Sequence, residues 1–328
     1  MRWLITGAHG FIGTNFVRFL HSHTKEIAIV DCNTYAADPT NLADLNLKTY
    51  TVDISNYEHM KTIFDLEKPN IVINFAAESH VDRSIEGPQV FIKSNVLGTS
   101  VLLTLSLQSF TRFVQISTDE VYGSVEQQGG VAFNETMALI PSSPYSASKA
   151  SADLLLKSFV HTYKMDALIT RCSNNYGPYQ HPEKLLPKCI INAHLDNQIP
   201  VYGSGLNKRD WIHVSDHCKG IYLAAINGKA GEVYNFGGAC CIPNIDLVKK
   251  VIHKQQKTET LISFVEDRKG HDMTYAVNFA KSKKELGWQP EIPFEVGLQG
   301  TIEWYLQNQK WWKPKVALPY SLQEGTVL

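Results

Sequence analysis

Four residues have side chains suited to acid–base chemistry, and they fall in two short segments. Tyr145 and Lys149 are four residues apart, so on a helix both side chains lie on one face. A nearby ammonium group stabilises a phenolate, which would make the tyrosine a usable base. Asp119 and Glu120 are adjacent, and two carboxyl groups in different surroundings can divide the roles of acid and base. In isolation both patterns are weak evidence. A Tyr and a Lys at this spacing often occur by chance, and adjacent acids are usually solvated surface charge.

A glycine-rich segment near the N-terminus predicts a dinucleotide site. Gly7, Gly10 and Gly13 follow a short apolar run and precede a segment with helical periodicity, so backbone amides and the helix dipole can meet a pyrophosphate there. Glycines at a helix start are weak evidence alone. Asp31 follows 18 residues after Gly13, at the end of the second apolar run, where an acid can bind an adenosine ribose. Because this acid would repel a 2′-phosphate, the sequence favours NAD over NADP.

Apolar runs that alternate with helical segments are expected to position these residues. We expect strands at 3–5, 27–30, 50–52, 71–75 and 113–116, and helices at 11–22, 56–67, 88–109 and 145–164. This alternation predicts an α/β fold, a Rossmann-type doubly wound parallel sheet with helices on both faces. Ligands of such sheets bind at the carboxyl ends of the strands. The segments 53–54, 76–77 and 117–123 are expected to lie at these ends.

The second half of the chain is more irregular. After residue 176, pieces punctuated by Gly and Pro alternate with amphipathic helices expected at 183–195, 215–227, 244–256 and 294–308. We therefore expect an NAD-binding domain at residues 1–176. Residues 177–328 are expected to form mainly a smaller substrate-binding lobe, interleaved with late strands of the first domain.

Composition limits the classes of partner. The 328 residues carry a net charge of −1 and are 44% hydrophobic, which is ordinary globular usage and lacks the basic excess of a nucleic-acid binder. The N-terminus does not read as a signal peptide, and no stretch is expected to approach the ~20 apolar residues of a membrane helix. We expect a cytoplasmic protein without membrane contacts. The six cysteines lack the spacing of a zinc site, and no metal is expected.

A series of longer motifs resembles one family, the dTDP-glucose 4,6-dehydratases, which are extended members of the short-chain dehydrogenase/reductase (SDR) superfamily. The resemblance covers almost the whole chain and implies the extended SDR fold, with a smaller C-terminal substrate-binding lobe. The segments that carry it are 76–84, 117–123, 145–149, 172–180, 182–185, 209–211 and 270–272.

The resemblance implies a hydro-lyase that converts dTDP-glucose or UDP-glucose to the 4-keto-6-deoxy-glucose nucleotide. Tyr145 would remove the proton of the sugar 4-hydroxyl as hydride leaves C4 for NAD, with Lys149 tuning the phenol and Thr118 holding the hydroxyl. Glu120 would be the base at C5, and Asp119 the acid that protonates the departing C6 oxygen. The hydride would then return to C6, so NAD would be retained between turnovers.

The resemblance and the glycine segment together give a set of expected contacts. Cofactor contacts are expected from Gly7, Gly10, Phe11, Ile12, Gly13, Asp31, Thr34, Asp53, Ile54, Ala76, Ala77, Ser79, Ser94, Tyr145, Lys149 and Asn175. Contacts with the nucleoside-diphosphate glucose are expected from Ser79, Thr118, Asn174, Lys184, Leu185, Pro200, Tyr202, Arg209, Arg268 and His271. The chain departs from the family at Cys240-Cys241 and Met273-Thr274, which leaves the choice between dTDP and UDP open.

Three alternatives share parts of this pattern. A UDP-sugar 4-epimerase would use NAD, Tyr145 and Lys149 but needs no acid pair at 119–120. A UDP-glucuronate decarboxylase would want a cation for the substrate carboxylate, which Asp119 would oppose. A non-catalytic NAD-binding scaffold is the remote alternative. The family resemblance also implies a homodimer built on helices 88–109 and 145–164, although their apolar faces could equally be buried within one chain.

Overall fold

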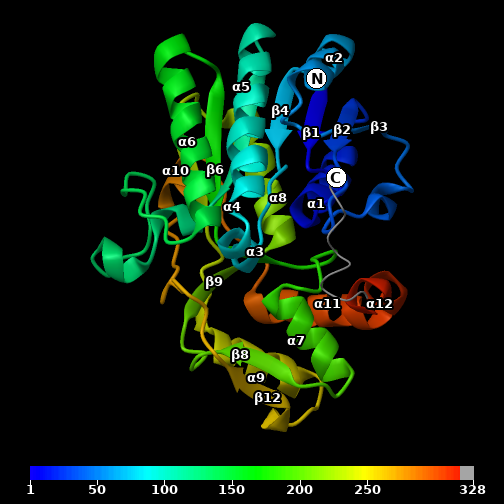
Figure 1. Cartoon of the computed structure of the whole chain (residues 1–328), viewed down its shortest axis with the longest axis vertical. Helices are drawn as coiled ribbons and strands as arrows, with labels where there is room; N and C mark the ends of the chain where they lie inside the picture. Colours follow the sequence, from blue (N-terminus) through cyan, green and yellow to red (C-terminus); the bar gives the residue numbers. More distant parts are fainter. Residues whose placement is uncertain (318–328) are drawn as a thin grey trace.

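The computed structural model describes residues 1–317 and contains a seven-stranded parallel sheet (Figure 1). The strand order is β10-β6-β5-β4-β1-β2-β3, the doubly wound order of a Rossmann-type fold. This confirms the predicted fold class and all five predicted strands. The strands are β1 (Trp3–Thr6), β2 (Ile27–Asp31), β3 (Lys48–Thr51), β4 (Ile71–Asn74), β5 (Arg112–Thr118), β6 (Ala167–Cys172) and β10 (Val233–Phe236).

Both faces of the sheet are buried under helices. Along β1, Trp3 and Ile5 belong to one apolar cluster and Leu4 to another, because successive side chains of a strand point to opposite faces. One face is covered by α1 (Phe11–His21), α8 (Val214–Asn227) and α10 (Ala280–Leu286). The other is covered by α2 (Tyr57–Glu67), α5 (Thr99–Gln108) and α6 (Pro144–Tyr163), and Figure 1 shows α5 and α6 running alongside each other.

The helix expected at 88–109 is one continuous stretch with an irregular middle. It consists of α4 (Pro88–Phe91), the π-helical segment η2 (Ile92–Gly98) and α5. We expected no stretch to approach a membrane helix. By length and composition alone this is wrong, since Pro88–Gln108 is long and apolar enough to cross a membrane. Half of its most apolar window is buried inside the protein, as in the core helix of a globular domain.

The smaller lobe lies beyond the carboxyl ends of the strands, in the lower half of Figure 1. Two short sheets, β11-β9-β7 and β12-β8, pack with helices around a separate apolar cluster. The strands are β7 (Asn174–Tyr176), β8 (Ile199–Tyr202), β9 (Lys208–His213), β11 (Cys241–Pro243) and β12 (Ile262–Val265). The helices are α7 (Leu185–His194), α9 (Asn244–Lys254), α11 (Phe294–Gln307) and α12 (Gln309–Ala317). Between β9 and β11 the chain returns to the large sheet as β10, while the domain division at residue 176 stays a prediction.

Helix α6 is fixed at its start and along its length. Ser143 caps it by accepting a hydrogen bond from the Ser146 backbone N–H at 3.1 Å, and Pro144 occupies the first turn, where no N–H is needed. Further along, Asp153 Oδ2 accepts a hydrogen bond from Arg171 Nε of β6 at 2.8 Å, and both side chains are fully buried. The ion pair therefore ties α6 to the sheet.

Removing one partner of this pair should destabilise the protein strongly. Asp153→Ala leaves the Arg171 guanidinium buried without its carboxylate, and we expect the free energy of unfolding to fall by about 3–5 kcal/mol in chemical denaturation. The double variant Asp153→Leu with Arg171→Met removes both charges and should recover most of the loss. Equal stability of Asp153→Ala and the wild-type chain would contradict this account.

Candidate active site

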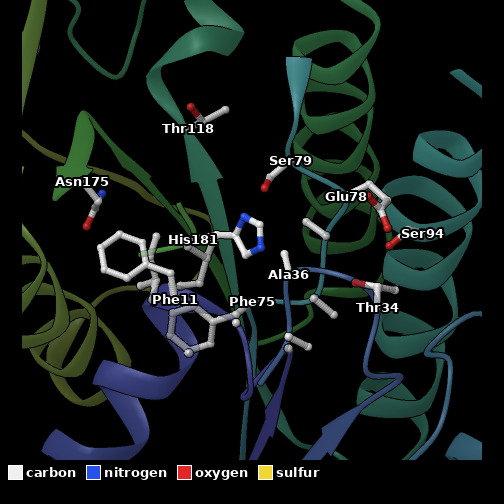
Figure 2. A pocket seen from close by; sticks show the side chains of 18 of the residues that line it. Phe11, Thr34, Ala36, Phe75, Glu78, Ser79, Ser94, Thr118, Asn175 and His181 are labelled. Atoms are coloured by element: carbon white, nitrogen blue, oxygen red, sulfur yellow. The ribbon is translucent and has the colours of Figure 1, made fainter. Parts of the chain in front are cut away.

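A cavity runs along the carboxyl edge of the large sheet, and every residue expected to contact the cofactor lines it. Figure 2 shows this cavity, with Phe11 of α1, Thr34 after β2, Thr118 of β5 and Asn175 of β7 among the labelled side chains around it. The residues come from seven different segments, and most of them meet there because the carboxyl ends of parallel strands lie at one edge.

The glycines at the start of α1 allow two backbone segments to approach each other closely. Gly7 has a φ of +69°, and a Cβ there would lie 2.4 Å from the Ala76 backbone nitrogen. A Cβ on Gly13 would lie 2.2 Å from the Gly7 carbonyl oxygen. No larger residue fits at either position without moving the backbone. The open cradle at the start of α1 fits a bound pyrophosphate.

Asp31 is held rigidly at the end of β2. Its Oδ2 accepts a hydrogen bond from the His9 backbone N–H at 2.9 Å, and its Oδ1 accepts one from the Asn33 backbone N–H at 2.8 Å. Each carboxylate oxygen keeps further acceptor capacity, which suits the two hydroxyl groups of a ribose. The cradle and this carboxylate together fit a dinucleotide such as NAD.

Tyr145 and Lys149 of α6 line the same cavity. The Lys149 ammonium donates a hydrogen bond to the Ile116 carbonyl oxygen at 2.6 Å, and burial lowers the pKa of Lys149 to about 8. Burial and the neighbouring Glu120 raise the pKa of Tyr145 well above its usual range. In the absence of other charges, the phenol is therefore protonated.

A residue that sequence reasoning missed supports Tyr145. Asn95 lies in the π-helical segment η2, and its Nδ2 donates to Ser148 Oγ at 2.8 Å. Ser148 Oγ in turn donates to the Tyr145 carbonyl oxygen at 2.7 Å. Asn95 also exchanges two hydrogen bonds with the Glu78 backbone, at 2.9 and 3.0 Å. No signal in the sequence identifies this bridge, because it depends on how η2 packs between α6 and the end of β4.

The two carboxyl groups have different surroundings. Asp119 begins the short helix η3 (Asp119–Tyr122) and is 2% exposed, and its Oδ2 has no hydrogen-bond partner within residues 1–317. Burial, then Glu120 and Asp210, raise the pKa of Asp119 well above its usual range. Burial also raises the pKa of Glu120, but the cations Arg209, Lys184 and Arg268 oppose that rise. Asp119 is thus the more easily protonated of the two acids.

Thr118 links these acids at the end of β5. Its Oγ1 accepts a hydrogen bond from the Glu120 backbone N–H at 3.3 Å and donates one to Asp119 Oδ1 at 3.3 Å. It caps η3 in this way, and it fixes the direction in which the acid pair enters the cavity.

A second cavity adjoins the first and reaches into the smaller lobe. Glu120, Asn174 and Lys184 line both cavities. All residues expected to contact the sugar nucleotide line one or both of them, and Thr118 faces only the first. The expected contacts that line the second cavity are Ser79, Asn174, Lys184, Leu185, Pro200, Tyr202, Arg209, Arg268 and His271.

Three cations in the second cavity could bind a diphosphate. The Arg209 guanidinium donates to the carbonyl oxygens of Lys208 and Asp272 at 2.7 and 3.0 Å. Lys184 Nζ donates to the Ser79 carbonyl oxygen at 3.1 Å. Arg268 pairs with Asp82, with 2.7 Å between Nε and Oδ1. Arginine suits this task because its fork can pair with two phosphate oxygens.

Further residues line the cavities without having been predicted. They include His80, Asp82, His181, Glu183, Trp211 and Tyr275. Most belong to segments that carry the family resemblance, whereas Tyr275 had no signal in the sequence. The departures at Cys240, Cys241, Met273 and Thr274 are not among the described residues that line either cavity.

Comparison with known proteins agrees with this geometry. A family model described as GDP-mannose 4,6 dehydratase matches residues 4–301. The dTDP-glucose 4,6-dehydratase of Xanthomonas campestris pv. campestris is 43% identical, with 94% of each chain covered. The dTDP-glucose 4,6-dehydratase 1 of Escherichia coli K12 is 42% identical, covering 95% of this chain and 94% of that protein.

A solved structure extends the likeness to three dimensions. The dTDP-glucose 4,6-dehydratase DesIV from Streptomyces venezuelae, crystallised with NAD and TYD bound, matches with a TM-score of 0.93 and 41% identity. The match covers 96% of this chain and 100% of that one. Because the fold, the sequence identity and the coverage all agree, the chain belongs to the dTDP-glucose 4,6-dehydratase family of extended SDR proteins.

Proposed function

We propose that the protein is an NAD-dependent nucleotide-glucose 4,6-dehydratase that acts on dTDP-glucose. The observation that carries the proposal is the place of the acid pair. Asp119 lines the cofactor cavity together with Tyr145 and Lys149, and Glu120 lines both cavities. A 4-epimerase would need only Tyr145 and Lys149, and burying two acids without a task is costly. A decarboxylase would set its substrate carboxylate against Asp119.

NAD, when bound, supplies the oxidant for C4 of the sugar and the reductant for C6. We propose that the cradle at Gly7, Gly10 and Gly13 receives the pyrophosphate and that Asp31 binds the adenosine ribose. Tyr145, Lys149 and Asn175 are proposed to lie at the nicotinamide end, where the two cavities meet. The remaining proposed contacts are Phe11, Ile12, Thr34, Asp53, Ile54, Ala76, Ala77, Ser79 and Ser94.

Tyr145 is proposed to take the proton of the sugar 4-hydroxyl, with Thr118 accepting or donating a hydrogen bond at the same oxygen. The buried phenol binds its proton tightly when alone, so a positive charge must lower its pKa before it can act as a base. Lys149, one helical turn along α6, provides such a charge when it is protonated.

Glu120 and Asp119 are proposed to eliminate water across C5 and C6. Glu120 takes the C5 proton that the 4-ketone has made acidic, and Asp119 gives its proton to the departing C6 oxygen. The surroundings support this division, since burial favours the protonated acid at Asp119 whereas three cations favour the carboxylate at Glu120. The proton gained by Glu120 and the one lost by Asp119 leave the net charge of the pair unchanged.

For the substrate, we propose that Arg209, Arg268 and Lys184 bind the diphosphate. Asn174, Leu185, Pro200, Tyr202 and His271 are proposed to contact the remainder of the sugar nucleotide. The sequence departures at Cys240, Cys241, Met273 and Thr274 do not line the described cavities, so they give no reason to move away from the dTDP-glucose of the relatives.

A homodimer is also proposed. Ile85, Val90, Ile92 and Leu97 are between 39% and 57% exposed along α3 (Val81–Glu86), α4 and η2, and Leu154 of α6 is 57% exposed. Exposed apolar side chains on neighbouring helical elements suit an interface between copies. A cytoplasmic place of action stays a prediction from the sequence.

Product analysis tests the function directly. Incubation of the protein with dTDP-glucose should give a 4-keto-6-deoxy product without added NADH, and it should do so faster than with UDP-glucose. Mass spectrometry and proton NMR identify the product. A product that is only the C4 epimer would contradict the proposal, and faster turnover of UDP-glucose would contradict the proposed nucleotide.

The division of roles predicts a specific partial reaction. Asp119→Asn combined with Glu120→Gln should lower dehydration by at least about 10²–10⁴-fold, because both proton transfers to the C5–C6 bond are lost. Tyr145 and Lys149 remain, so substrate should still reduce bound NAD in part, seen as nicotinamide absorbance. The surface acids Asp65 and Glu58 on α2 provide the control, since Asp65→Asn with Glu58→Gln should dehydrate normally. Wild-type dehydration by the active-site double variant would show that these residues are misassigned.

The lowered pKa of Lys149 predicts a pH dependence of stability. The folded state holds this amine at a pKa of about 8, whereas its ordinary pKa is 10.5, so the unfolded chain binds more protons between these values. Stability of the wild-type chain should therefore rise, relative to Lys149→Met, by roughly 3 kcal/mol as pH increases through this window. Denaturation of both proteins at several pH values measures the difference. If the two free energies of unfolding differed by the same amount at every pH, Lys149 would not be a buried ionisable amine.

A further inference from the structure

One hydrogen bond crosses from the cofactor loop, residues 32–38 after β2, to the segment that enters the smaller lobe. The Tyr35 hydroxyl donates to Glu183 Oε1 at 2.9 Å, joining residues 148 positions apart in sequence. Neither residue was predicted to contact a ligand. Thr34 and Ala36, on either side of Tyr35, line the cofactor cavity, and Glu183 lines both cavities. The bond therefore connects two walls of the site.

The bond is made in a sheltered environment. The side chain of Glu183 is 10% exposed, and burial followed by Glu183 raises the pKa of Tyr35, which keeps its hydroxyl protonated as a donor. A carboxylate acceptor makes the hydrogen bond stronger than one between neutral groups. Two histidines flank the carboxylate, with His80 Nε2 at 3.7 Å and His181 Nδ1 at 3.8 Å.

The histidines do not supply the charge that balances Glu183. Burial lowers the pKa of His80 to about 4 and that of His181 to about 3, so both rings are neutral near neutral pH. Figure 2 shows the His181 ring among the side chains that line the cofactor cavity. It also meets the Tyr35 ring edge to face, with 5.6 Å between ring centroids. A cation lies against the donor ring instead, since the Arg83 guanidinium carbon is 3.5 Å from the Tyr35 ring centroid.

The other end of the cofactor loop is held as well. Asp38 Oδ2 accepts a hydrogen bond from Lys315 Nζ of α12 at 2.6 Å, and Trp311 Nε1 of the same helix donates to Asn41 Oδ1 at 2.7 Å. The loop is therefore fastened to α3 through Arg83, to the smaller lobe through Glu183, and to α12 through Lys315. These three contacts hold a loop that lines the cofactor cavity through Thr34, Ala36 and Ala37.

We infer that Tyr35 and Glu183 are positioning residues that keep the cofactor loop closed over bound NAD. The inference rests on the proposed function, in which the cofactor is regenerated within each turnover and gains nothing from exchange. The Tyr35–Glu183 bond must break before the cofactor loop can open. Its loss speeds the escape of NAD, whereas the residues proposed to carry out the chemistry stay in place.

The release rate of NAD tests this inference. The protein is loaded with radiolabelled NAD, chased with unlabelled NAD and sampled by rapid filtration. Tyr35→Phe removes only the hydroxyl and should release NAD about 10-fold faster or more, the usual effect of losing a hydrogen bond to a charged group. Glu183→Gln keeps an acceptor oxygen and should release NAD more slowly than Glu183→Ala. The double variant Tyr35→Phe with Glu183→Ala should be no faster than Glu183→Ala alone, because both changes remove one bond.

A matched control is available elsewhere in the chain. Tyr50 of β3 donates a hydrogen bond to Glu67 of α2 and lines neither cavity, so Tyr50→Phe should leave NAD release unchanged. Wild-type release by Tyr35→Phe, or equal acceleration by Tyr50→Phe, would overturn the inference while the proposed dehydratase stands. A wild-type chain that retains no labelled NAD would overturn both.

Discussion

Parallel pairing of the central strands is the constraint on which the rest of the structure depends. In register, Thr6 of β1 is paired with Asn74 of β4, and Thr118 of β5 with Cys172 of β6. A buried polar chain runs across these strands, in which Thr6 Oγ1 donates to Asn74 Oδ1 at 2.6 Å and Asn74 Nδ2 donates to Gln115 Oε1 at 2.9 Å. Buried polar groups need their partners, so a shift of one strand would leave them unsatisfied. The register that results brings the ends of all these strands to one edge.

The chemistry of the site follows from what is buried at that edge. Around one cavity the protein brings together a lysine, a tyrosine and two carboxyl groups, and burial disfavours the charged form of each. Neighbouring cations then make the pKa values of the two acids differ, because three cations oppose the rise in the pKa of Glu120. Similar side chains thus acquire different proton affinities through position alone.

The smaller lobe contributes to the site in two ways. It supplies Arg209 and Arg268, which favour the charged form of Glu120 and could bind a diphosphate. Through Glu183 and Lys315 it also reaches back to the loop after β2, so that one set of contacts spans the cofactor side and the substrate side. The two lobes therefore complete one site between them.

The sequence by itself determined the sheet class, five of its seven strands and the long helices, because apolar periodicity records which faces are buried. The sequence and the family resemblance also predicted residues that line the two cavities, and the motifs directly after parallel strands meet there at one edge of the sheet. Strands β6 and β10 were not singled out. β10 has only four residues, one of them the polar Asn235, and it pairs with a strand that is distant in sequence. Tertiary structure alone decided the Asn95 bridge, the Tyr35–Glu183 bond and the cations around Glu120. Each joins residues from separate segments, and its energy depends on distances and burial that spacing along a chain does not encode.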